Sequence, residues 1–498
     1  MSFSSAITKL LSAVDSVNAA SFSNNLSALQ LLLKDPKNSI RFFIYSSSGM
    51  GHQSTAANII YRLISLGLTG SYQVIYVNAF DALKKIAALF PQFDPKNPDT
   101  PIVIGAVTLT FIELDDFQKS SPTLLNIGIA GGTDGIMHEN FAAELYVNYL
   151  LVLQPYQWYQ EPSVIQLNNG TRVNLDANEV LESLSFSKRG YFIDIPKMTA
   201  QEITFFQASA YADKYPAFDA ITSSLLAQKS NMMPVYGLTM FDSPGTRTSD
   251  VMLFNLATAI AYAQDNTASV GNAVKGTIVI VLSELSDDTY ESFDALLAGT
   301  DPRLEGSPLK AWVTTRKLST RVKHINYDDP LLPSAIGQVE SKATRIMFVN
   351  MGGVPLYAFN YLYNVSDMPP VFEGAATNSL VLNFGKNYLA LRSGINRDFI
   401  LYPTLPLNTE QPSAEAATVD AASRLVESTI MEWGRDLNNE AVLGTPASIL
   451  GMDILIAFEP PDASGQQYFA SLGAFFHNQQ EDKMLMGVFS LLQYLKNK

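Results

Sequence analysis

Short apolar runs alternate with longer stretches of helical spacing from about residue 39 onward. The run 41–46 (RFFIYS) predicts a buried strand, and residues 53–66 predict the helix that follows it. The pair repeats as a strand at 72–78 and a helix at 79–89. Further strands are predicted at 102–107, 124–130 and 149–153, and helices near 177–184 and 199–228.

The same alternation starts again near residue 235. Strands are predicted at 235–240, 276–283, 311–315, 345–349 and 388–391, and helices at 249–264 and 287–297. Repeated strand–loop–helix units are typical of a parallel sheet with helices on both faces. The chain is therefore expected to be an α/β protein with two doubly wound, Rossmann-like domains.

Turn signals and the change of pattern divide the chain into four predicted parts. Residues 1–38 form an N-terminal helical extension that ends in the turn DPKN, and residues 39–232 form the first Rossmann-like domain. Residues 233–430 form the second such domain, and residues 431–498 form C-terminal helices that pack back on the first. The boundary between the two domains is expected near Asn231 and Pro234.

Composition narrows the expected partners and compartment. The 498 residues include 16% charged side chains and no cysteine, and the formal net charge is −14. An acidic chain binds nucleic acid and anionic lipid poorly by bulk electrostatics, so neither is an expected partner. No uninterrupted apolar run is long enough to span a membrane, and the first residues do not read as a signal peptide. We expect a cytoplasmic protein, or one exported without a classical signal.

The first predicted strand runs into a loop that carries candidate chemistry. Gly49 and Gly51 follow this strand, and His52 stands where the next helix begins. Glycines at such a turn let a ligand approach the backbone, and the amides at the helix start attract anions. A histidine there can serve as a general base near neutral pH. The alternative is a glycine turn with a histidine that only caps the helix.

A second candidate stretch lies at 369–380, where a short strand ends in small and polar residues. Glu373 and Gly374 close the strand, and Thr377 and Asn378 open the next predicted helix. Glu373 is placed to accept hydrogen bonds from ligand hydroxyls or from helix amides. The alternative is an N-capping cluster that binds no ligand.

Two further loops contribute candidates. Gly245, Thr246 and Arg247 precede a predicted helix, where backbone amides and one guanidinium are suited to a phosphate. Gly132 and Asp134 follow the strand at 124–130 and are candidates for an acceptor site. The 245–247 loop is equally well explained as a surface turn, and a plain turn is the favoured interpretation of the loop with Gly132 and Asp134. The sequence contains no HExxH or D-x-D motif, so no metal site is expected.

Taken together, these stretches resemble the GT-B glycosyltransferases. The sequence GMGH at 49–52 is similar to the glycine loop of the monogalactosyldiacylglycerol synthases and the peptidoglycan GlcNAc transferase. The order of elements over 357–389 resembles the donor region of that family, with Gly385, Lys386 and Asn387 standing where G-K-P is usual. The resemblance implies two Rossmann-like domains that face a cleft.

The resemblance also implies an activity: transfer of a sugar from a nucleoside diphosphate sugar, with UDP the expected carrier, to an unknown protein, lipid or glycan acceptor. It places Glu373 on the ribose or sugar hydroxyls and His52 near the acceptor. The 245–247 loop occupies the place of the donor-phosphate loop. No cofactor or catalytic metal is implied, and self-association remains open.

Two alternatives to this activity stay open. One is a catalytically inactive protein of the same shape that serves as a structural, interaction or self-assembling module. Its few charges and many Tyr, Ser, Asn and Gln residues suit polar protein–protein contact. The other is a sugar-phosphate epimerase of the same architecture, which needs more carboxylates in the cleft than the sequence supplies.

Overall fold

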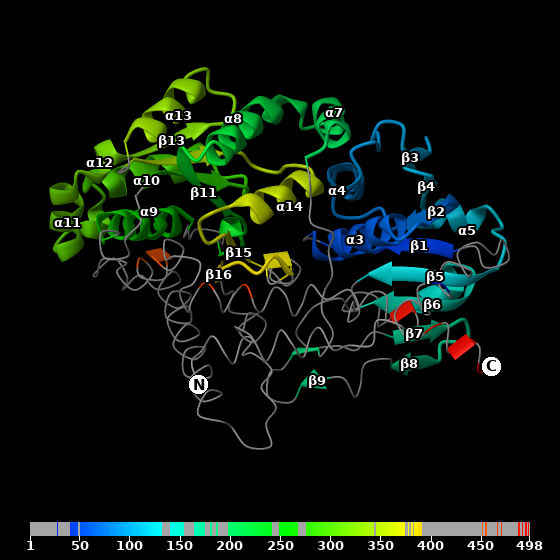
Figure 1. Cartoon of the computed structure of the whole chain (residues 1–498). Coiled ribbons are helices and arrows are strands. Elements are labelled where there is room, and N and C mark those ends of the chain that lie inside the picture. Colours follow the sequence, from blue (N-terminus) through cyan, green and yellow to red (C-terminus); the bar gives the residue numbers. More distant parts are fainter. Residues whose placement is uncertain are drawn as a thin grey trace, which may run out of the picture. The chain divides into compact units, whose positions relative to one another are not determined.

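The computed structural model of the chain describes most of the two predicted sheet regions (Figure 1). The described residues are 40–47, 50–131, 140–153, 164–174, 180–181, 186–187, 198–241, 249–266, 275–342, 345–373, 380–381 and 383–390, with shorter stretches at 27, 377, 451, 454–455, 466, 470, 487–488, 491, 494–495 and 497.

The chain divides into two compact units, each with its own sheet. The first-sheet unit comprises Lys9–Ala210, Pro355–Tyr357 and Gly473–Lys498, and the second-sheet unit comprises Met1–Thr8, Tyr211–Val354 and Ala358–Leu472. The boundary expected between residues 232 and 233 falls inside a strand of the second sheet, Ser230–Val235. The chain instead passes between the units just before Tyr211.

The first sheet has eight strands in the order β3-β4-β2-β1-β5-β6-β7-β8, with parallel pairing from β4 through β6. Its outer strands β3, β7 and β8 pair antiparallel. Two short strands, β9 (Val180–Leu181) and β10 (Phe186–Ser187), pair with each other. The strands of the eight-stranded sheet are β1 (Ile40–Ile44), β2 (Gly70–Tyr76), β3 (Ile102–Ile104), β4 (Val107–Glu113), β5 (Leu125–Gly131), β6 (Val147–Leu153), β7 (Val164–Leu167) and β8 (Arg172–Asn174).

Helices cover this sheet because its central strands are apolar on both faces. Every residue of β1 is buried, as expected for a central parallel strand. Helix α3 (Gly51–Ser65) packs on β1 and β5 and also contacts α4 (Ala82–Leu89). It ends just before Gly67, whose φ of 100° suits the end of a helix. The remaining helices of the unit's described part are α5 (Leu114–Lys119), α6 (Phe141–Glu144) and α7 (Ala200–Ala208).

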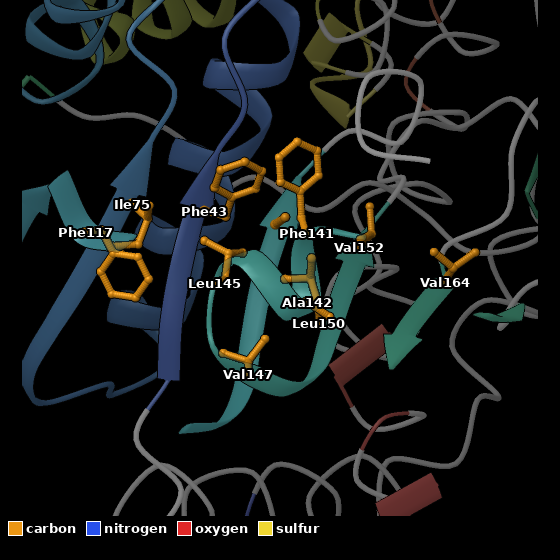
Figure 2. Close-up of a cluster of buried hydrophobic side chains, with 11 residues drawn as sticks. Phe43, Ile75, Phe117, Phe141, Ala142, Leu145, Val147, Leu150, Val152 and Val164 are labelled. Carbon is orange, nitrogen blue, oxygen red and sulfur yellow. The ribbon is translucent and has the colours of Figure 1, made fainter. Parts of the chain in front are cut away.

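A core cluster joins α5 and α6 to the first sheet (Figure 2). Phe43 of β1 and Phe141 of α6 lie with their ring centroids 4.8 Å apart. Leu145, directly after α6, and Leu150 of β6 are fully buried in the same cluster. At roughly 1.5–3 kcal/mol for each large apolar side chain removed from water, this cluster is a main source of stability in the unit.

The second sheet has six strands, all parallel, in the order β13-β14-β12-β11-β15-β16. Its central strands β11 and β12 are buried along their whole length. The strands are β11 (Ser230–Val235), β12 (Gly276–Val281), β13 (Val322–Asn326), β14 (Ile346–Asn350), β15 (Val371–Phe372) and β16 (Leu389–Ala390).

Helices lie on both faces of the second sheet. Figure 1 shows α8 (Tyr215–Leu226) and α13 (Leu332–Ser341) on one face and α9 (Ser249–Asn266) on the other. The contacts agree, because α8 packs on α13 and α9 packs on α10 (Asp287–Ala298). Further helices of the described part are α11 (Pro308–Arg316), α12 (Leu318–Arg321) and α14 (Leu356–Val365).

Residues near the C-terminus contact both sheet units. A Cβ at Gly451 would lie 2.5 Å from the ring of Tyr262, so this glycine allows a close approach to α9. A Cβ at Gly487 would lie 2.1 Å from Leu153 of β6. The Tyr494 ring meets that of Tyr149, also on β6, at 6.0 Å. The chain therefore returns to the first-sheet unit after leaving the second.

The structure confirms the α/β class and is compatible with a Rossmann-like fold, but several predicted elements were wrong. Residues 311–315 belong to helix α11, which starts with Pro308 and is capped by the Ser307 hydroxyl. The strand expected at 235–240 is β11, five residues earlier. The strand expected at 102–107 is an antiparallel hairpin of β3 and β4. Part of the helix expected near 177–184 is strand β9, and β13 and α13 were not predicted.

Within the described residues, no helix is long and apolar enough to cross a membrane. The N-terminal extension expected at 1–38 lies outside the described residues, apart from Ser27.

Candidate functional site

Each sheet has a point where the order of its strands reverses. In the first sheet the chain proceeds from β1 to β2 and β4 and then returns to β5, on the other side of β1. In the second sheet it proceeds from β11 to β12 and beyond and then returns to β15, on the other side of β11. Open α/β sheets bind ligands outside the carboxyl ends of the strands at such switch points.

His52 stands at the switch point of the first sheet. It is the second residue of α3 and is half-buried, and its ring meets that of Tyr45 edge-on at 5.7 Å. Gly51 is exposed, and a Cβ added there would meet no atom within 4 Å. The space around the start of α3 is therefore open at Gly51. Its N-cap, Met50, makes no side-chain cap.

The glycine that packing does require at this switch point is Gly131, the last residue of β5. A Cβ on Gly131 would lie 2.7 Å from Thr55 Cγ2 and 2.8 Å from the nitrogen of Ala56. The missing side chain lets the first turns of α3 press against the end of β5. Helix α3, whose second residue is His52, contacts both β1 and β5.

Glu373 stands at the switch point of the second sheet. It directly follows β15 and is buried. Gly237, two residues beyond β11, has a φ of 92°, and a Cβ on it would lie only 2.4 Å from the Cβ of Glu373. Burial and the charge of Glu373 raise the pKa of the neighbouring Tyr236. The strand ends thus bring together a carboxylate, a glycine turn and a half-buried tyrosine.

The predicted phosphate loop leads into a helix start that already carries a carboxylate. Asp250, in the first turn of α9, accepts a hydrogen bond from Val251 N–H at 2.8 Å. Arg303 lies 2.7 Å from Asp250 and 2.8 Å from Asp301, and the hydroxyl of Ser292 also donates to Asp250. Arg303 is a cation that sequence reasoning missed. It is held by two carboxylates of the chain itself.

A single lysine, Lys214, contacts the loops at the carboxyl ends of β13 and β14. Lys214 Nζ donates to the carbonyl oxygen of Gly353 at 2.8 Å and lies 5.5 and 5.1 Å from the rings of Tyr211 and Tyr327. The Tyr327 hydroxyl donates to Asp213 at 2.5 Å, which raises the pKa of Tyr327 to about 12. These contacts fix the loop after β14 to the turn before α8.

The structure describes four of the twelve predicted site residues. His52 and Gly51 lie in the first-sheet unit, whereas Glu373 and Thr377 lie in the second-sheet unit, where Thr377 is buried in a helical turn. In this described part, no three His, Asp or Glu side chains gather as metal ligands. The other predicted residues lie outside the described positions: Gly49, Gly132, Asp134, Gly245, Thr246, Arg247, Gly374 and Asn378.

Sequence reasoning missed Gly237 and Tyr236. Both were assigned to the interior of a strand, because β11 was expected at 235–240. A tyrosine–glycine pair directly after the run 232–235 (MMPV) was the available signal for a strand end.

Comparison with known proteins gives no match, either among protein-family models or among curated proteins. The resemblance to GT-B enzymes therefore rests on the residues quoted above.

Proposed function

We propose that the protein is a glycosyltransferase that moves a sugar from a nucleoside diphosphate sugar to an acceptor. In the reaction, the bond between the anomeric carbon and the diphosphate oxygen breaks and a bond from the acceptor oxygen forms. His52 accepts the acceptor's proton, and the nucleoside diphosphate leaves with the negative charge. Glu373 accepts hydrogen bonds from donor hydroxyls.

The observation that carries this proposal is the position of Glu373. A buried carboxylate stands at the switch point of an all-parallel sheet, against a glycine with positive φ. Ligands of doubly wound folds bind outside the carboxyl ends of the strands at the switch point, and a carboxylate there can accept hydrogen bonds from nucleotide hydroxyls.

The path of the chain supports the same proposal. Two sheets with corresponding switch points lie in separate units, and the C-terminal residues return to the unit of the first sheet. The GT-B resemblance implies this path, with a cleft between the two domains.

One observation favours the alternative of an inactive protein with this architecture. Asp250 places a negative charge in the first turn of α9, just after the expected phosphate loop. An anion at a helix start is stabilised by the helix amides and disfavours a second anion there. The binding experiment below separates the two functions.

The test is a thermal-shift screen against UDP, GDP, dTDP and their sugar conjugates, followed by calorimetric titration. A ligand at 100 times its dissociation constant adds about 2.7 kcal/mol to the free energy of unfolding, a shift of several degrees. We expect one nucleotide family to give this shift. If none does at millimolar concentration, the inactive alternative replaces the proposal.

The matched variants are Glu373→Gln and Glu340→Gln. Glu340 is a partly exposed residue of α13 that pairs with Lys229 at 3.6 Å. Glu373→Gln should weaken nucleotide binding at least tenfold, about 1.4 kcal/mol, while Glu340→Gln should leave it unchanged. Equal affinities in the two variants would remove Glu373 from the site.

A further inference from the structure

A serine from the neighbouring strand holds the glycine turn after β11. Ser283 follows β12 by two residues and is 5% exposed. Its Oγ accepts hydrogen bonds from Gly237 N–H at 3.0 Å and from Leu238 N–H at 3.2 Å. One buried hydroxyl thus satisfies two backbone donors at the point where the chain leaves the sheet.

The backbone turn that Ser283 holds packs directly against Glu373. The Cα of Gly237 faces Glu373 so closely that a Cβ would fall 2.4 Å from the Cβ of Glu373 and 3.0 Å from its backbone nitrogen. The strand order β12-β11-β15 places the three residues on adjacent strand ends. A shift of the turn therefore has to move Glu373 as well, because close-packed groups transmit displacement.

We infer that Ser283 is a positioning residue for Glu373, which it holds in place through the backbone of Gly237 and Leu238. Glycine or alanine at position 283 would have no hydroxyl to accept these two hydrogen bonds. The effect on a ligand rests on the proposed function, whereas the effect on the turn does not.

The ligand-free test measures the turn itself. Ser283→Ala should speed hydrogen exchange in peptides covering 236–240 at least tenfold, because the two amides lose their acceptor. Ser283→Thr keeps the hydroxyl and should keep exchange slow. The matched control is Ser224→Ala, which removes a buried hydroxyl that lies 2.8 Å from Ser230 Oγ, at the opposite end of β11. Unchanged exchange at 236–240 in Ser283→Ala would overturn the inference.

A second ligand-free readout follows Glu373. Its charge raises the pKa of Tyr236 in addition to the effect of burial. Ser283→Ala should therefore change the titration of Tyr236 in the same direction as Glu373→Gln, measured by NMR on labelled tyrosine with Tyr236→Phe for assignment. A Tyr236 titration identical to that of the unmodified chain would contradict the coupling.

The ligand test is a double-mutant cycle with the nucleoside diphosphate that gives the largest shift among UDP, GDP and dTDP. Ser283→Ala should weaken binding about tenfold, and Ser283→Ala/Glu373→Gln should bind no more weakly than Glu373→Gln alone. Additive losses would show that Ser283 acts independently of Glu373 and would overturn the inference. If the unmodified chain binds none of the three, the proposed function fails, and the exchange and titration results still decide the positioning role.

Discussion

Arg41 is a buried arginine held by backbone carbonyls and one amide. It is 2% exposed, and its guanidinium donates to the carbonyl oxygens of Leu145, Tyr146 and Thr123 and to the side chain of Gln73. Burial lowers its pKa from 12.5 to about 10, so the group stays protonated at neutral pH. This residue ties the start of β1 to the turns around α6 and before β5.

Replacing Arg41 by Met should lower the free energy of unfolding by about 3 kcal/mol or more. The reason is that each buried acceptor left without a donor costs on the order of 1 kcal/mol or more. Denaturant unfolding monitored by circular dichroism measures the loss. Arg172→Met, on the exposed edge strand β8, is the control and should change stability by less than about 0.5 kcal/mol. Equal effects would show that the buried contacts of Arg41 contribute little.

Of two glycines at the first switch point, one should lose stability on replacement by alanine and the other should not. Gly131→Ala forces a Cβ to within 2.7 Å of Thr55 and 2.8 Å of the backbone of Ala56, so it should cost about 1–3 kcal/mol. Gly51→Ala meets no atom within 4 Å and lies in the first turn of a helix, so stability should stay within about 0.5 kcal/mol. Thermal unfolding compares them. Similar losses in both would contradict the packing assigned to Gly131.

At the scale of elements, β11 shows why strand position was hard to predict. Pro234 lies within this strand, although proline is rare in central strands. Tyr236 N–H donates to Val371 of β15, so Pro234, two residues earlier, faces the same side. On that side the β15 ladder begins only at Val235, and no donor is needed from Pro234. Sequence periodicity does not contain this information.

A buried carboxyl group beside the same strand should make the stability of the protein depend on pH. Asp367 accepts the Met232 N–H at 2.7 Å before β15 begins, and burial raises the pKa of Asp367 from 3.8 to about 6. A carboxyl with a raised pKa stabilises the fold fully below its unfolded pKa, and this stability is lost as pH rises through the folded value. As the pH rises from about 4 to about 6, the free energy of unfolding of the unmodified chain should therefore fall relative to that of Asp367→Asn, by about 3 kcal/mol.

Chemical denaturation at pH 4 and at pH 6.5 measures that difference. A difference between Asp367→Asn and the unmodified chain that is the same at both pH values would show that Asp367 does not titrate in this window.

The sequence predicted the continuous apolar strands β1, β2, β5, β12 and β14 within a few residues, because a buried parallel strand is apolar along its length. It also placed His52 at a helix start and Glu373 at a strand end, as the structure shows. The sequence pattern does not predict the contact of Ser283 with Gly237. That contact depends on β12 and β11 being neighbours, which only the topology decides.

At the scale of the whole molecule, residues near the C-terminus belong to the first-sheet unit and pack within it. Val488 and Leu491 are buried, and Tyr494 meets Tyr149 of β6. Each buried aliphatic side chain contributes roughly 1.5–3 kcal/mol. Removing residues 473–498, the last segment of the first-sheet unit, should therefore destabilise that unit by several such contributions.

Hydrogen exchange resolves this effect by unit. Without residues 473–498, peptides from β5 and β6 should exchange faster, while peptides from β11 and β12 should keep their rates, because the second sheet has a separate core. Tyr494→Ala should reproduce part of the effect on β6. The control Leu226→Ala, which changes an exposed side chain of the second-sheet unit, should alter neither sheet. Equal acceleration in both sheets would mean that the two units unfold as one, and the division of the chain into separately stable units would then be wrong.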